Sequence, residues 1–196
     1  LIANKDQNEE RLTTLLTKRS RIVATAENKM VALRNLMKDR TNESQFLFYC
    51  GDGTVDDSGS DDEVRHVDGV CKLLGNDLKM RVAKYTAENT IEERKLLGNR
   101  LASGELQGLV AIRCLDEGVD IPSIEKAVIL ASSTNPRQFI QRRGRILRKS
   151  PTKESAEIYD MIVYPPTGEK VSKIERNLLR KELLRYAEFA DLALNA

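Results

Sequence analysis

The sequence contains no tryptophan, one histidine and three cysteines in 196 residues, and these scarcities exclude several classes of protein. Cys50, Cys71 and Cys114 lie far apart and form no CxxC pair, which argues against a disulfide framework. A metal site made of Cys50, His66 and Cys71 would lack close ligand pairs and a fourth ligand. We therefore predict no bound metal and expect buried thiols instead.

Long apolar runs are also missing. No stretch approaches the roughly 18 apolar residues of a membrane span, and no signal peptide is evident. These absences predict a cytoplasmic protein with no membrane partner.

A strong charge of one sign is absent as well, because 32 Lys and Arg residues stand against 30 Asp and Glu residues. Any binding to nucleic acid must therefore depend on a local basic patch. The length suits one full core with helical extensions and is too short for two ordinary domains.

Helical periodicity covers residues 7–40 and predicts one long helix, or two helices joined near Ala24 and Thr25. Beyond residue 42, short apolar runs alternate with helical stretches. Strands are predicted at 45–50, 81–85, 109–112, 126–131 and 158–164. Helices are predicted at 64–74, 91–103 and 136–147, and from 169 onward. The acidic, glycine-rich stretch 51–69 is interpreted as a mobile surface loop that enters the first of these helices, which should stop at Gly75.

Thr90 and Glu93 have the spacing of a capping box, which predicts a helix start at Ile91 and a stop at Gly104. The strands are nearly all apolar, and such strands belong to parallel sheets covered on both faces. Ligands bind these sheets at the carboxyl ends of the strands. The fold class is therefore α/β with a mostly parallel sheet.

Four arginines surround one glycine in the stretch QRRGRILR at 141–148. On a helical wheel Gln141, Arg145 and Arg148 fall opposite the apolar arc, Arg142 lies at the border, and Arg143 points into the apolar arc. Two rigid guanidinium groups at i and i+3 can converge on one polyanion. Helix geometry alone leaves two interpretations open, namely charge stabilisation on a transferring phosphoryl group and a clamp on a nucleic-acid backbone.

QRRGRILR resembles motif VI of the superfamily-two helicases, Q/H-x-x-G-R-x-x-R, and further segments follow the family order. FLFYC at 46–50 resembles the motif IV strand, YTAE at 85–88 a small loop that contacts nucleic acid, and LVAIRCLDEGVDIPSIEKAVIL at 109–130 motif V with its next strand. The resemblance covers about residues 20–165. It implies a RecA-like three-layer domain, most similar to the repair-helicase and type III restriction-like DNA translocases.

The resemblance also implies roles for matching residues. Arg145 and Arg148 would be arginine fingers that reach ATP phosphates, and Gln141 would position the γ-phosphate or the attacking water. The implied nucleotide-binding residues are Glu117, Gly118, Asp120 and Arg142. The implied nucleic-acid-binding residues are Thr86, Arg113 and Cys114.

Plainer interpretations of some of these residues stay open. Asp120 could cap a turn, Glu117 could be a solvated loop carboxylate, and Arg142 could bond the motif V loop. Ile112 stands where many relatives have a threonine, which weakens the case for a hydroxyl-to-phosphate contact there. Arg143 has no assigned task beyond a guessed buried ion pair.

The sequence has no G-x-x-x-x-G-K-[ST] phosphate cradle and no acidic metal-binding strand. The resemblance therefore implies a second motor domain whose partner is an N-terminal RecA-like domain of the same chain, with ATP and Mg²⁺ held there and none by this stretch alone. The start at Leu1, inside a helical pattern, agrees with a fragment. DNA is the expected partner, and RNA stays open.

We expect three parts: a helical segment at 1–42, the RecA-like domain at 43–166 and a helix at 167–196. Two competing functions are a non-catalytic nucleic-acid-binding module that uses the basic helix, and a small Rossmann-type transferase with a cofactor turn at Gly51-Asp52-Gly53. The carboxylates around that turn argue against the transferase.

Overall fold

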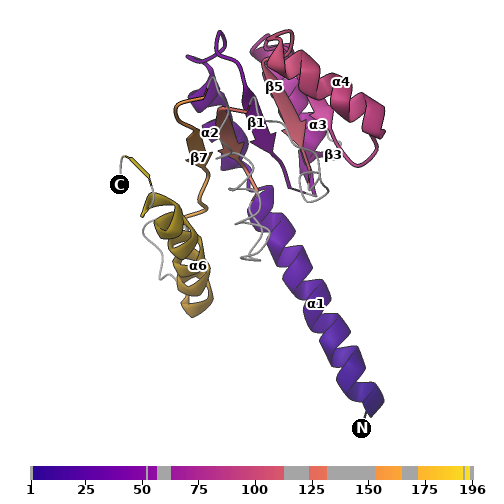
Figure 1. Ribbon diagram of the computed structural model, residues 1–196. Helices are drawn as coiled ribbons and strands as arrows, with labels where there is room; N and C mark the ends of the chain where they lie inside the picture. Colours follow the sequence, from indigo (N-terminus) through magenta and orange to yellow (C-terminus); the bar gives the residue numbers. More distant parts are fainter. Residues whose placement is uncertain are drawn as a thin grey trace. The chain divides into compact units, whose positions relative to one another are not determined.

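The computed structural model describes residues 2–51, 53–56, 63–112, 124–131, 153–164, 172–191 and 193–194 (Figure 1). The chain forms two compact units, Leu1–Tyr159 and Asp160–Ala196, which are described separately below.

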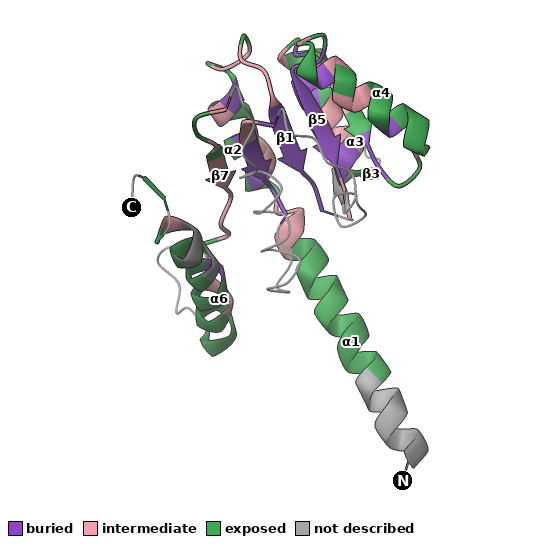
Figure 2. Cartoon of the chain, in the orientation of Figure 1, coloured by how far each residue is buried: buried purple, intermediate pink, exposed green. Residues whose placement is uncertain are grey.

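A five-stranded sheet lies at the centre of the fold, in the order β4-β5-β1-β6-β7. Its strands are β1 (Phe46–Tyr49), β4 (Val82–Tyr85), β5 (Gly108–Ala111), β6 (Lys126–Ile129) and β7 (Glu157–Asp160). The β1 strand pairs in parallel with β5 and β6, and β5 pairs in parallel with β4. All four residues of β1 and of β5 are buried, as Figure 2 shows in purple. The mostly parallel sheet predicted from the apolar runs is confirmed.

Helices cover both faces of this sheet. They are α2 (Asn28–Met37), α3 (His66–Cys71), which continues into the π-helical segment η1 (Lys72–Asp77), and α4 (Ile91–Ala102). Both α3 and α4 pack against β4 and β5. The chain moves from β1 to β4 in one direction along the sheet and returns from β4 to β5 in the other. Because such crossovers are right-handed, α3 and α4 lie on opposite faces, which gives three layers.

The N-terminal periodicity corresponds to two helices, α1 (Ile2–Ala24) and α2, so the second of the two predicted alternatives is correct. The break follows Thr25, whose amide donates to the Arg21 carbonyl at 2.9 Å. α2 packs on the core through Leu33 and Met37. The apolar side chains that α1 exposes are Leu12, Leu15, Leu16 and Ile22. Figure 2 shows the described part of α1 as mostly exposed.

The second unit contains helix α6 (Lys173–Ala190), which agrees with the helix predicted from residue 169 onward.

The prediction of a loop that enters a helix at Val64 is wrong in two places, because the residues on either side of 57–62 form strands. Strands β2 (Thr54–Asp56) and β3 (Glu63–Arg65) form an antiparallel pair, with Val55 opposite Val64. Val64 is therefore in a strand rather than a helix, and α3 begins two residues later than predicted. The prediction failed because a three-residue ladder is too short to show a period of its own. The mixed composition of this stretch also gives no apolar run that would indicate a strand. Residues 57–62 lie outside the described residues.

The predicted helix stop at Gly75 is also wrong, because the helical path continues through η1 to Asp77. The Leu78 amide donates to the Leu73 carbonyl at 3.1 Å, and the left-handed residue that ends the segment is Lys79, with φ of 58°. A glycine normally takes that conformation at low cost, so the sequence pattern favoured Gly75.

The last predicted strand is likewise shorter than expected, since β7 ends at Asp160 and residues 161–164 have no regular structure.

The capping box at the start of α4 is confirmed. The Glu93 amide donates to Thr90 Oγ1 at 3.2 Å, and the Thr90 amide donates to Glu93 Oε2 at 2.8 Å. After the helix, Gly104 adopts φ of 76°, as the predicted stop requires. A second box of the same kind joins Ser172 and Glu175 ahead of α6.

Removing the Thr90 hydroxyl should destabilise the chain by a measurable amount. Thr90→Ala leaves the Glu93 amide without its side-chain acceptor, so we expect a loss of about 1 kcal/mol in the free energy of unfolding. Urea titration followed by circular dichroism measures this loss. Thr90→Ser keeps the hydroxyl and should stay within a few tenths of wild type. Equal stability of the alanine and serine variants would contradict a role for the box.

Candidate functional site

The candidate site is the edge of the sheet at which four parallel strands end. In the strand register, Tyr85 of β4 pairs with Ala111 of β5, Ala111 with Tyr49 of β1, and Tyr49 with Ile129 of β6. The residues that follow these strand ends therefore emerge at one edge, called here the carboxyl edge. This is the edge at which α/β sheets bind ligands.

Most residues predicted for the site come after two of these strand ends in the sequence, either soon after β5 or, for the arginine motif at 141–148, 12 or more residues after β6. The described chain reaches Ile112 after β5 and Ala131 after β6. The predicted residues that lie outside the described residues are Arg113, Cys114, Glu117, Gly118, Asp120, Gln141, Arg142, Arg145 and Arg148, and the same holds for Arg143. Their roles stay predictions, and Thr86 is the predicted site residue that the structure describes.

Thr86 lies in a tight turn after β4, called here the Thr86 turn (residues 86–89). Its amide donates to Asn89 Oδ1 at 2.8 Å, and the Asn89 amide returns a bond to the Thr86 carbonyl at 3.2 Å. The Glu88 amide approaches Thr86 Oγ1 at 3.4 Å. Thr86 is only 5% exposed, while Ala87 and Glu88 are exposed. The threonine thus holds the turn together, and its neighbours present the accessible surface.

Arg94 of α4 supports the Thr86 turn from the interior. Its side chain is buried, its Nη2 atom donates to the Thr86 carbonyl at 3.3 Å, and its guanidinium lies 5.9 Å from the centre of the Tyr85 ring. A charged donor to a backbone carbonyl and a cation–π contact both hold the last residue of β4 and the first residue of the turn. Arg94 was not among the predicted site residues, although its place four residues after the capping threonine puts it in the first turns of α4.

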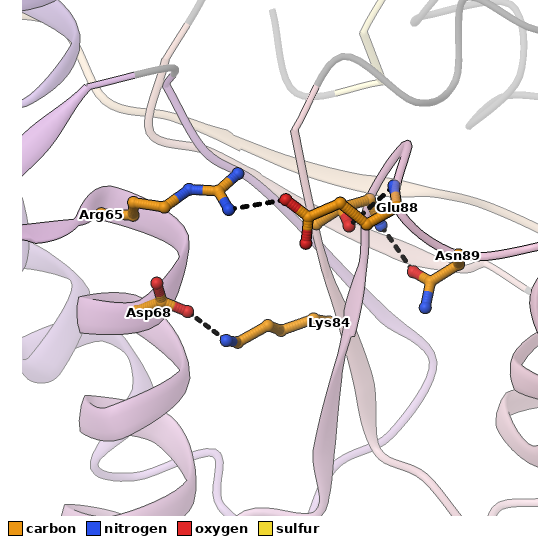
Figure 3. A network of polar contacts seen from close by, with 6 residues as sticks. Arg65, Asp68, Lys84, Glu88 and Asn89 are labelled. Atoms are coloured by element: carbon orange, nitrogen blue, oxygen red, sulfur yellow. Dashed lines mark hydrogen bonds and ion pairs between the residues drawn. The ribbon is translucent and has the colours of Figure 1, made fainter.

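Two ion pairs join the start of α3 to β4 and the Thr86 turn (Figure 3). Arg65 Nη1 lies 2.8 Å from Glu88 Oε1, and Lys84 is paired with Asp68. The hydrogen bond to Asp68 is the main reason that the pKa of Lys84 is raised. No sequence signal indicates either pair, because the partners are 23 and 16 residues apart and belong to different elements.

The Gly51-Asp52-Gly53 turn begins at the same edge but serves packing. The Gly51 amide donates to His66 Nδ1 at 3.0 Å, and the His66 amide donates to the Gly53 carbonyl at 2.7 Å. A Cβ atom at Gly51 would lie 2.8 Å from the Cβ of Ala24, so glycine allows the last residue of α1 to pack this close to the turn. A cofactor turn would direct its amide to a phosphate. The Gly51 amide bonds a side chain instead, which argues further against the transferase alternative.

Lys29 and His66 are the buried polar groups next to this turn. The Lys29 ammonium donates to the Leu130 carbonyl, directly after β6. The pKa of His66 is lowered from 6.5 to about 4, first because the ring is buried and second because of the nearby Lys29 charge. His66 is therefore neutral near pH 7, which leaves Nδ1 able to accept a hydrogen bond from the Gly51 amide. These two side chains hold the exits of β1 and β6.

Among the described residues, the cysteines Cys50 and Cys71 are poor nucleophiles near pH 7, because their thiols stay protonated. Burial raises the pKa of Cys50 well above its usual range and that of Cys71 to about 11. Within the described ranges, no group of three His, Cys, Asp or Glu side chains is arranged to hold a metal ion. Among the same residues, no helix is both long and apolar enough to cross a membrane.

Comparison with known proteins bears directly on this sheet and its edge. The family model described as the helicase conserved C-terminal domain matches residues 28–150, which run from the first residue of α2 past β6. The chain belongs to this family. The match leaves out α1, which precedes it.

The chain is also similar to two curated proteins that are named as a translocase and a helicase. The chain is 26% identical over 148 residues to the DNA 3'-5' translocase XPB2 of Sulfurisphaera tokodaii, which covers 76% of this chain and 30% of that protein. It is 29% identical over 89 residues to the ATP-dependent helicase hrq1 of Schizosaccharomyces pombe, which covers 45% of this chain and 8% of that protein. The chain thus spans less than a third of the length of either relative.

Two solved structures have a fold similar to that of this chain. The C-terminal domain of the DEAD-box protein Dbp5 superposes with a TM-score of 0.53 at 18% identity, over 87% of this chain and 83% of that one. The C-terminal part of the Fun30 ATPase domain gives a TM-score of 0.54 at 15% identity, over 82% of this chain and 54% of that one. The RecA-like fold expected from the sequence is confirmed.

The neutral state of His66 predicts how stability depends on pH. The pKa of His66 in the folded chain lies below its value of 6.5 in the unfolded chain, so the contribution is fully present above pH 6.5 and is lost as pH falls toward 4. We expect a loss of about 3 kcal/mol from this group. His66→Asn, whose amide oxygen can still accept from Gly51, should remove this part of the pH dependence in urea titrations.

The same expectation can be checked directly by NMR, because His66 is the sole histidine of the chain. Its ring Cε1–H resonance should titrate with a midpoint near pH 4. A midpoint near 6.5 would show an exposed ring and contradict the bond to Gly51.

Proposed function

We propose that this chain is the second motor domain of an ATP-dependent DNA helicase or translocase. The single observation that carries the proposal is the match of the helicase C-terminal family to residues 28–150, on a parallel sheet whose strand ends precede motifs V and VI. In this proposal, Arg145 and Arg148 reach across to the phosphates of ATP and Gln141 positions the γ-phosphate or the attacking water. The nucleotide contacts come from Glu117, Gly118, Asp120 and Arg142.

ATP and Mg²⁺ would be held by an N-terminal RecA-like domain of the same protein. The described residues provide no cluster of metal ligands, and the sequence has no GK[ST] phosphate loop. What this chain offers instead is guanidinium groups, which suit phosphate oxygens and not a cation. Bound ATP supplies the phosphoryl transfer that drives the cycle, and the arginines of this chain stabilise the charge that develops on the transferred group.

The grip on nucleic acid would come from the same edge. The Thr86 turn, with Arg113 and Cys114 after β5, would contact the backbone of a strand. Binding of this kind depends on phosphates, so it is sensitive to salt and little dependent on sequence. DNA is the proposed substrate because the XPB2 relative is named a DNA translocase. Opening and closing of the two motor domains would move these contacts along the strand.

The motor proposal predicts a specific defect for Arg145→Ala in the full-length protein. We expect kcat of DNA-stimulated ATP hydrolysis to fall by roughly 10³ or more, because a finger arginine acts on the transition state. The affinity for DNA should change little. Steady-state ATPase assays at saturating DNA, with fluorescence anisotropy for DNA binding, measure the two effects separately.

Arg100→Ala is the matched control for this experiment. Arg100 is a partly exposed arginine near the end of α4, paired with Glu105 at the opposite edge of the sheet. Its removal should leave kcat unchanged. If Arg145→Ala weakens DNA binding but leaves kcat intact at saturating DNA, the helix is a backbone clamp and the motor proposal is wrong.

A further inference from the structure

We propose that Arg65 is a phosphate ligand of the nucleic-acid track and that Glu88 competes with the phosphate for it. In the chain without nucleic acid, Glu88 holds the guanidinium, and a bound phosphate takes its place. The inference rests on the proposed function, because it assumes that nucleic acid runs past the Thr86 turn. It adds a residue outside the predicted motifs and a carboxylate that sets the affinity of the site.

The position of the pair is the first argument. Arg65 is the last residue of β3 and directly precedes α3, while Glu88 belongs to the Thr86 turn (Figure 3). The amide of Glu88 approaches the Thr86 hydroxyl, so the carboxylate belongs to the turn that is predicted to meet a phosphate. An uncompensated carboxylate at that place would repel the phosphate. The Arg65 guanidinium, 2.8 Å away, neutralises it.

The exposure of the pair is the second argument. The Arg65 side chain is 51% exposed and that of Glu88 is 71% exposed. Ion pairs this open to water contribute little to folding stability, so opening this one costs the fold little. A guanidinium presents a planar fork of donors that fits a phosphate as well as a carboxylate. The same group can therefore be exchanged between the two anions.

The neighbouring pair of Lys84 and Asp68 is a natural control. It also joins α3 to the β4 region, and it lies within a few residues of the first pair in the sequence. Lys84, however, belongs to the strand and precedes the turn, and Asp68 lies inside α3 (Figure 3). The four side chains are balanced in charge, so removing one charge from either pair changes the net charge equally. The two pairs differ in that Glu88 belongs to the Thr86 turn, whereas neither Lys84 nor Asp68 does.

The test measures binding of a labelled single-stranded DNA oligonucleotide to the full-length protein without nucleotide, by fluorescence anisotropy at several salt concentrations. We expect Arg65→Ala to weaken binding roughly tenfold. The slope of log affinity against log salt should fall in magnitude by about one. Glu88→Gln should strengthen binding severalfold, because it removes the competing carboxylate and keeps the shape of the side chain.

Three further variants separate competition from simpler effects. Asp68→Asn and Lys84→Ala make the same charge changes in the other pair and should each shift the affinity less than twofold. Arg65→Lys keeps the charge but loses the fork, so it should fall between wild type and Arg65→Ala while keeping most of the salt slope. It also replaces Arg65→Ala if that variant does not fold, as judged by circular dichroism.

The outcomes are distinguishable. Opposite shifts for Arg65→Ala and Glu88→Gln, with small shifts in the control pair, support the inference. If Arg65→Ala and Glu88→Gln shift the affinity in the same direction, the pair only stabilises the turn. If Glu88→Gln and Asp68→Asn shift the affinity equally, the effect is one of general charge. Either result overturns the inference. If the Arg65 and Glu88 variants all bind DNA as the wild type does, this inference alone is overturned. If the full-length protein binds no DNA, the proposed function is overturned as well.

Discussion

The in-register pairing of β1 with both of its neighbours is the constraint on which the rest of the domain depends. β1 is the middle strand of the sheet, is fully buried, and bonds in parallel to β5 on one side and β6 on the other. Parallel strands in register must end together, so one edge collects the exits of β4, β5, β1 and β6. Burial on both faces holds β1 in the core, and its parallel ladders to β5 and β6 hold this register. The candidate site is therefore a consequence of core packing.

Buried polar side chains then fix how the chain leaves each strand. Lys29 bonds the exit of β6, His66 the exit of β1, and Arg94 the exit of β4. A buried polar group costs stability unless it is hydrogen-bonded. Each of these three side chains forms a hydrogen bond with a backbone group just past the end of a strand, where the sheet ladder no longer provides a partner. The exits are held by directional bonds rather than by apolar contact alone. Such bonds specify a conformation, which is what loops that position ligands require.

The two kinds of polar contact at this edge suit different tasks. The bonds of Lys29, His66 and Arg94 are buried, so breaking one would leave a costly unsatisfied group. The pair of Arg65 and Glu88 is exposed and can open at little cost. A rigid frame with a few exposed surface charges suits the proposed role of this domain, which is to grip and release a polyanion during each cycle. Membership in the helicase C-terminal family agrees with this division.

Local pattern was sufficient for much of the fold. The apolar runs located the strands of the main sheet, the Thr90 to Glu93 spacing located the start of α4, and the arginine motif indicated the family. These features depend on neighbours a few residues apart, so the sequence alone determines them. The β2–β3 pair and the left-handed Lys79 escaped prediction, since a three-residue ladder has no distinct period and a glycine was available nearby.

Tertiary structure decided what the sequence could not. Gly51 looked like part of a phosphate turn, yet its amide bonds a histidine 15 residues away and its missing side chain makes room for Ala24. Arg65 and Glu88 carry no local signal, because only the crossover from β1 to β4 places them side by side. Composition and spacing indicate contacts between residues that are close in the sequence. The contacts of Gly51, Arg65 and Glu88 join residues from different elements, and they form only when the sheet brings the ends of its strands to one edge.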